Sequence, residues 1–153
     1  MKVSMHNIAM LAVLSGALAV SPPVAAVATE TETSSSSNAD YVLGAEAAKA
    51  REWDRAAYHL AIAAEAEPNN PDVQNLLGST FRNQRKYELA FAHYRQALKL
   101  APNHRGAHEY IGEAYVLTGN GAKAMEHLVA LERICGKNCE EYQDLARALA
   151  TPR

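Results

Sequence analysis

Apolar and polar residues alternate with a helical period through much of this chain, most clearly from residue 71 to residue 103. In the first half of that stretch, Leu77 and Phe81 are four residues apart and share one helix face. In the second half, an i, i+4, i+7, i+8 spacing joins Ala90, Tyr94, Ala97 and Leu98. The pattern predicts two amphipathic helices that approach closely at Gly78, the second ending at Pro102.

The same pattern returns when the chain is stepped by 34 residues in either direction. Equivalent positions hold Leu43-Gly44, Leu77-Gly78 and Ile111-Gly112, then Ala56, Ala90 and Ala124, then Pro68, Pro102 and Gly136. We therefore expect three helical pairs, at 37–70, 71–104 and 105–138. We also expect Gly44, Gly78 and Gly112 to occupy equivalent close contacts between paired helices.

A Leu-Gly pair, two aromatic positions, Ala-x3-aromatic and a closing Pro over 34 residues resemble the tetratricopeptide repeat. The resemblance implies an all-α fold, an α-solenoid of three helix-turn-helix tetratricopeptide repeats plus a C-terminal capping helix at 139–150. It also implies a concave groove lined by the first helix of each pair, which in this family usually holds an extended peptide or a partner's helix. The repeats indicate the fold and not a particular partner.

Breakers and capping residues set the expected helix limits. We expect helices at about 39–50, after Asp54 to Ala66, at 71–83, 87–100 and 105–117, after Gly121 to Ile134, and after Asn138. Asn70 is expected to cap the third helix, with Pro71 in its first turn. Gly136 is a predicted C-cap. Asn138, with Glu141 three residues later, resembles a capping box.

The repeat register assigns thirteen positions to the groove: Tyr41, Ala45, Ala48, Lys49, Asp72, Asn75, Ser79, Arg82, Asn83, Glu109, Glu113, Val116 and Leu117. Asn75 and Asn83 can pair with a ligand backbone, because an Asn side chain both donates and accepts. Glu109 and Glu113 are four residues apart and favour a basic or polar segment at that end. The alternative interpretation is a merely solvated face.

Some family members grip acidic C-termini with a clamp of Lys, Asn and Arg. The matching positions here hold Tyr41, Ala45, Leu76, Gly106 and Tyr110. None of these residues fits, so we expect no clamp of that type.

The N-terminus resembles an export signal. Lys2 precedes an apolar run at 8–20, and Ala26-Val27-Ala28 offers a small-x-small cleavage pattern. We predict a signal peptide at 1–28, cleaved after Ala28 or alternatively after Ala26, with an uncleaved anchor as the competing interpretation. Residues 29–37 are predicted to be a solvated Ser/Thr/Glu-rich linker. The expected location is the bacterial periplasm or outside the cell, with no stable membrane span after cleavage.

Cys135 and Cys139 are the two cysteines of the chain, and in an oxidising compartment they favour a disulfide. The alternative is a metal- or redox-handling protein that uses them with His104 and His108, which are four residues apart. Three further histidines, His59, His93 and His127, are one repeat apart. We expect them to form a partly exposed column on the second helices, too widely spaced to share one metal ion.

The remaining features narrow the function class. A formal charge of −2 over 153 residues does not suggest a nucleic-acid surface. The sequence has no phosphate loop, Gly-x-Ser-x-Gly or His-Glu-x-x-His motif. We therefore expect a non-enzymatic protein-protein interaction module, an adaptor or scaffold without a cofactor, whose partner is a protein or peptide. Self-association through exposed helix faces is a further expectation.

Overall fold

The computed structural model describes the backbone from residue 30 to residue 151 and the side chains from residue 39 to residue 151. This part of the chain forms seven α-helices and no strand: α1 (Glu30–Lys49), α2 (Trp53–Ala66), α3 (Pro71–Asn83), α4 (Tyr87–Leu100), α5 (Arg105–Leu117), α6 (Gly121–Cys135) and α7 (Glu140–Ala150). The predicted signal peptide, residues 1–28, lies outside the described residues. No described helix is both long enough and apolar enough to cross a membrane.

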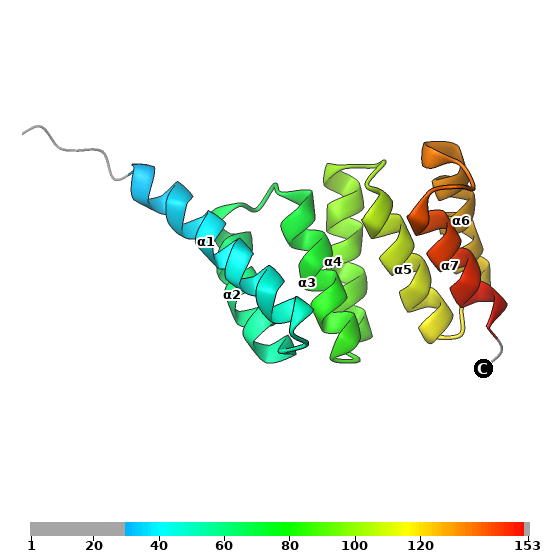
Figure 1. Ribbon diagram of the computed structural model, residues 1–153, viewed down its shortest axis with the longest axis horizontal. Coiled ribbons are helices and arrows are strands. Elements are labelled where there is room, and N and C mark those ends of the chain that lie inside the picture. The colour runs from blue at the N-terminus through cyan, green and yellow to red at the C-terminus, as the bar shows by residue number, and fades with distance from the viewer. Residues whose placement is uncertain (1–29, 152–153) are drawn as a thin grey trace, which may run out of the picture.

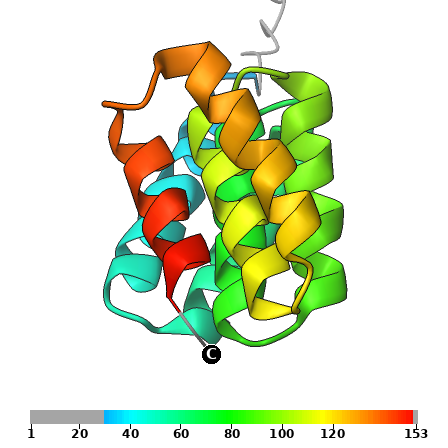
Figure 2. The same ribbon diagram turned by 90° about the vertical axis from the view of Figure 1, so that its right-hand side faces the viewer.

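The helices form two layers that run the length of the molecule. Helices α1, α3, α5 and α7 face the viewer in Figure 1, and α2, α4 and α6 lie behind them. Each first helix packs mainly on the second helix of its own repeat, α1 on α2, α3 on α4 and α5 on α6. Helix α7 packs on both α5 and α6 at the end of the stack (Figure 2). The predicted all-α solenoid of three helical pairs and one further helix is confirmed.

The 34-residue period is visible in the backbone of the turns inside each repeat. The second residue after each first helix has a left-handed conformation, at Arg51 (φ 60°), Arg85 (φ 61°) and Gly119 (φ 78°). The next residue in each turn donates its N–H to a carbonyl five positions earlier, in the pairs Glu52 to Ala47, Lys86 to Phe81 and Asn120 to Tyr115. This is the hydrogen-bond pattern of a Schellman motif, so all three turns close the first helix in the same way.

The core lies between the two layers and repeats with the same period. Ala56, Ala90 and Ala124 are fully buried on the three second helices. A Cβ built on Gly44 or Gly78 would come within 2.6 Å of Leu60 or Tyr94 of the paired helix. These two glycines therefore allow the close approach that the sequence predicts.

Gly112 departs from the expected equivalence. A Cβ built on it would meet Leu145 of α7 at 2.5 Å, and no atom of the paired helix α6 is nearer. The expectation that the three glycines are equivalent is therefore wrong, since the atoms nearest to Gly112 come from α7 and not from its own second helix. The reason is that α7 docks over α5, and its fully buried Leu145 fills the space beside Gly112.

Two predicted helix ends are also corrected. Helix α1 begins at Glu30 and not near Ala39, so the backbone of the expected linker is helical from residue 30. A helix extends readily from a packed segment, because each added residue gains a backbone hydrogen bond. Helix α7 has Cys139 at its N-cap with no side-chain cap, so the predicted capping box at Asn138 is absent.

Other predicted ends are confirmed. Asn70 caps α3, where its Oδ1 accepts from the N–H groups of Asp72 at 3.0 Å and Val73 at 3.4 Å. Gly136 is the C-cap of α6, with φ 79°. The turns between repeats therefore form from the residues that sequence analysis singled out.

Candidate peptide-binding groove

The predicted groove residues all lie on α1, α3 and α5, the first-helix layer, but they differ in how free they are. Lys49 and Asn83 are exposed, while Tyr41, Asn75 and Ser79 are half-buried. The amide of Asn83 donates to the carbonyl oxygen of Ser79 at 2.8 Å, within its own helix. Burial, followed by the nearby carboxylate of Asp72, raises the pKa of Tyr41.

Asn75 is the groove residue with an unmet hydrogen-bonding group. Its Oδ1 is buried and has no hydrogen-bond partner among the described residues. A buried acceptor without a donor is unfavourable, because it loses water and gains nothing in exchange. Asn75 lies on α3 close to Gly106 of α5, so a donor group supplied between these helices would satisfy it.

Arg82 and Glu113 form an ion pair between α3 and α5. The guanidinium of Arg82 also lies 5.2 Å from the centre of the Tyr110 ring, within cation–π range. The expected role of Glu113 as a free attractor for a basic segment is therefore wrong, since an internal arginine already neutralises it. The pair ties the second repeat to the third.

Glu109 is the most unusual residue of the groove. Only 8% of it is exposed, and no hydrogen bond or ion pair joins its carboxylate to another described residue. Its pKa is raised from 4.5 to about 7, chiefly by burial and also by the carboxylates of Glu141 and Glu140, while Arg82 acts in the opposite direction. Glu109 was predicted to be a groove residue beside Glu113, but the structure buries it beneath α7.

A cavity of about 240 Å³ lies where α5 meets α7. It is lined by Gly106, Glu109, Tyr110, Glu140, Glu141 and Asp144. The three α7 residues are missing from the predicted groove, because that groove was assigned to the first helix of each repeat and not to the capping helix. The sequence does hold a signal for them: one 34-residue step leads from Gly106 to Glu140 and from Tyr110 to Asp144.

The histidine column forms a repeated hydrogen bond that the sequence analysis missed. In each repeat, a second-helix histidine pairs through its Nδ1 with the first-helix residue 19 positions earlier. The pairs are His59 with Asp40 at 2.7 Å, His93 with Gln74 at 2.8 Å and His127 with His108 at 2.9 Å. Burial and then the neighbouring His108 lower the pKa of His127 from 6.5 to about 4. The constant separation of 19 residues was the available signal.

The suggested His104–His108 metal pair is already used by the fold. His104 is the N-cap of α5, where its Nδ1 accepts from the N–H of Ala107 at 3.1 Å and its Nε2 lies 2.9 Å from Asp72. The nitrogens of His108 contact His127 and the carbonyl oxygen of Pro102. All four ring nitrogens therefore have protein partners.

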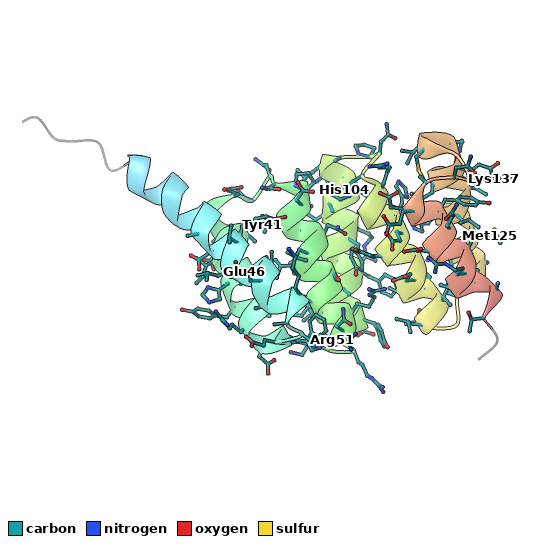
Figure 3. All side chains as sticks on the ribbon, in the orientation of Figure 1. Tyr41, Glu46, Arg51, His104, Met125 and Lys137 are labelled. Carbon is teal, nitrogen blue, oxygen red and sulfur yellow. A yellow bond between two sulfur atoms is a disulfide. The ribbon has the colours of Figure 1, made fainter. Side chains whose placement is uncertain are left out.

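Cys135 and Cys139 are joined in the structure, with Cα atoms 5.9 Å apart. The bridge connects the end of α6 to the N-cap of α7, beside the Lys137 loop in Figure 3. Among residues 39–151, Cys135, Cys139 and Glu141 are the one group of His, Cys, Asp and Glu close enough to hold a metal ion. Two sulfurs bonded to each other do not provide the thiolates that a metal requires.

Comparison with known proteins places the fold. A family described as "Tetratricopeptide repeat" matches residues 71–104. Comparison with curated protein sequences gives no match.

Several solved structures are similar. The "Arabidopsis OM64 TPR domain" has a TM-score of 0.71 at 14% identity, covering 76% of this chain and 96% of that one. The "First TPR of Spaghetti (RPAP3) bound to HSP90 peptide SRMEEVD" has a TM-score of 0.67 at 19% identity, covering 77% and 96%. A mutant of MamA has a TM-score of 0.60 at 28% identity, covering 64% and 72%. The second repeat, residues 71–104, thus matches the tetratricopeptide repeat, and the chain shares its fold of stacked helical pairs with these solved domains.

Proposed function

We propose that this protein is a non-catalytic adaptor that holds an extended peptide or a partner's helix against the layer formed by α1, α3, α5 and α7. The main support is that this layer carries polar groups whose bonding capacity the fold leaves unused. Asn75 has a buried acceptor without a donor, and Glu109 has a nearly buried carboxylate without a partner. Such groups are unfavourable in a surface with a purely structural role, and a ligand that satisfies them recovers the loss.

The charge of the groove favours a different kind of ligand from the acidic peptide bound by one structural neighbour. The RPAP3 domain was solved with the peptide SRMEEVD, which ends in acidic residues. Here the cavity between α5 and α7 is itself acidic, and the five positions of the acidic-tail clamp hold other residue types. Like charges repel across an interface, so the proposed ligand is basic or neutral and not an acidic tail.

The proposed setting is the periplasm or the extracellular space. The support is the signal-like N-terminus at 1–28 together with a cysteine pair that suits an oxidising compartment. Mass spectrometry of the protein from its native host is expected to give a chain that begins at Thr29 and has no free thiol. A chain that retains Met1, or two reactive thiols, would contradict this setting.

The function is tested by affinity capture from the native host with a matched pair of triple variants. The groove variant carries Asn75→Ala, Ser79→Ala and Asn83→Ala. The control variant carries Glu65→Ala, Arg95→Ala and Lys99→Ala, three exposed positions on the second helices α2 and α4. We expect the groove variant to lose partners that the control and the unmodified protein recover equally, with all three folded by circular dichroism. Equal recovery by both variants would rule out the groove as the binding surface.

A further inference from the structure

The cavity between α5 and α7 keeps a net negative charge after its ion pairs are taken into account. Glu141 lies 3.4 Å from Arg105, and Asp144 pairs with Arg147. Glu109 and Glu140 form no ion pair with a side chain from residue 39 onward, and Arg82, the cation that acts on Glu109, is already paired with Glu113. Two of the four lining carboxylates are thus free to meet a positive group.

Helix stability explains only part of this charge. Acidic residues in the first turn of a helix interact favourably with its dipole, which accounts for Glu140 and Glu141 at the start of α7. Glu109 lies in the second turn of α5 and is nearly buried, where a carboxylate loses its hydration. Its position is therefore unfavourable for folding alone, and a partner from outside the chain would offset that loss.

The protein already contains the kind of contact that this cavity could make. The Arg82 guanidinium lies between the carboxylate of Glu113 and the ring of Tyr110. The cavity presents a second carboxylate, that of Glu109, and is lined by the same Tyr110. A carboxylate together with an aromatic ring is a favourable environment for a guanidinium or an ammonium group.

We propose that the cavity between α5 and α7 binds the cationic head group of a Lys or Arg side chain from a peptide in the groove, with Glu109 as its main acceptor. This inference rests on the function proposed for the groove. The volume of about 240 Å³ is below that of usual small-molecule pockets and suits a single side chain.

The geometry favours an organic cation over a metal ion. A metal ion needs several ligand atoms around one point. The carboxylates of Glu109, Glu140 and Asp144 do not meet this condition, since the one such group among the described residues is Cys135, Cys139 and Glu141. Carboxylates that lie apart from one another beside the ring of Tyr110 suit the several N–H donors of a Lys or Arg head group better than they suit a metal ion.

The test is an NMR titration of the full chain with N-acetyl-argininamide and N-acetyl-lysinamide, with N-acetyl-glutaminamide as the neutral control. We expect both cationic probes, and not the neutral one, to shift the amide signals of Gly106, Glu109 and Glu140. Glu109→Gln should weaken binding by roughly tenfold, because a charge-assisted contact is lost. Glu46→Gln removes an equal charge from the exposed surface of α1 and should change nothing.

Two further measurements keep the test decisive. Glu140→Gln, at an exposed position, should weaken binding by about threefold and serves if Glu109→Gln fails to fold. Binding should also strengthen between pH 6 and pH 8, because Glu109 becomes ionised over this range. The charged and titratable groups that face Glu109 are Glu140 and Glu141 of α7, Arg82 of α3 and Tyr110 of α5. Equal affinity in the wild type and both variants, or Ca²⁺ shifting the same signals at lower concentration than the cationic probes, would overturn the proposal.

The outcomes for the cavity and for the groove are separable. If captured partners depend on Asn75, Ser79 and Asn83 but not on Glu109, the groove function stands and the cation site is wrong. If the amide probes bind the cavity while no partner depends on the groove triple, the cation site stands and the groove function is wrong.

Discussion

The second and third repeats share a sequence pattern but differ in which helix packs against the glycine of the first helix. In the second repeat, Tyr94 is fully buried against Gly78, and His93 pairs with the neutral Gln74. In the third repeat, Gly112 is closed by Leu145 of α7, and the shorter Leu128 stands where Tyr94 does, 8% exposed. The regular repeat closes the space beside its glycine with its own second helix, whereas the irregular one closes it with the helix that follows.

The polar groups of the two repeats differ in kind. The second repeat keeps three buried side-chain oxygens without a hydrogen-bond partner among the described residues, those of Asn75, Gln84 and Tyr94. The third repeat contains a pair of neighbouring histidines, His108 and His127, and the buried Glu109. Burial lowers the pKa of both histidines and raises the pKa of Glu109, so in all three residues it favours the neutral form. The lesson is that regularity supports the fold, while the departures from it place these groups on α5 and α6 of the third repeat.

The largest expected effect is on the free energy of unfolding when equivalent core residues of the two repeats are replaced by alanine. Tyr94→Ala should lower the free energy of unfolding by about 3–5 kcal/mol, because a fully buried ring leaves a cavity that the neighbouring helices cannot close. Leu128→Ala should lower it by about 2–3 kcal/mol, since less apolar surface is lost and the site is partly open. Urea unfolding of both variants measures the difference. Equal losses would mean that the two cores are equally complete.

The second effect concerns Glu109 and pH. Its pKa is raised from 4.5 to about 7 in the folded protein, so its favourable contribution is fully present below pH 4.5 and is lost as pH rises through 7. Glu109→Gln should therefore raise stability by roughly 2 kcal/mol at pH 8 and leave it nearly unchanged at pH 4. Thermal or urea unfolding at both pH values gives the result.

A matched control sharpens this prediction. Glu46→Gln at an exposed position should leave stability unchanged at both pH values. A loss of stability for Glu109→Gln at pH 8 would show that the carboxylate is needed for packing. We predict the opposite result: the variant is more stable but binds the ligand more weakly. This is expected when a residue that binds a ligand lowers the stability of the fold.

The third effect has the opposite pH dependence. The pKa of His127 falls from 6.5 to about 4, so its contribution is fully present above pH 6.5 and is lost as pH falls toward 4. His108→Gln copies the Gln74–His93 pair of the second repeat into the third. It should reduce the loss of stability between pH 8 and pH 5 by roughly 1 kcal/mol, because one of two mutually repelling histidines is removed.

One outcome would contradict this prediction. If the loss of stability between pH 8 and pH 5 is unchanged or larger in His108→Gln, the His108–His127 pair does not set the pH response.

The fold was predictable because its determinants are local and periodic. Small residues at Gly78 and Ala90 and an aromatic at Tyr94 leave few ways to pack two helices, and a 34-residue step repeats that constraint. The prediction failed where packing reached beyond one repeat: at Gly112, whose neighbour comes from α7, and at Asn138, where Cys139 takes the N-cap.

The groove was predicted less well than the fold, because register gives the direction of a side chain but not its partner. Positions 82, 109 and 113 were placed on the correct helices, yet Arg82 and Glu113 neutralise each other and α7 covers Glu109. Whether a charged residue is free depends on helices far away in sequence, as the 31-residue separation of Arg82 and Glu113 illustrates.

The smallest expected effect lies in the turns inside the second and third repeats. Here the third repeat has the residue that suits the backbone conformation better. Arg85 and Gly119 occupy equivalent left-handed positions, with φ 61° and 78°. A side chain disfavours this conformation by roughly 1–2 kcal/mol, part of which glycine offsets through its greater freedom when unfolded. Arg85→Gly should therefore raise the free energy of unfolding by roughly 0.5 kcal/mol, and Gly119→Ala should lower it by about 1 kcal/mol. If urea unfolding gave both substitutions the same sign, the turns would not be equivalent in energy, although their hydrogen bonds repeat.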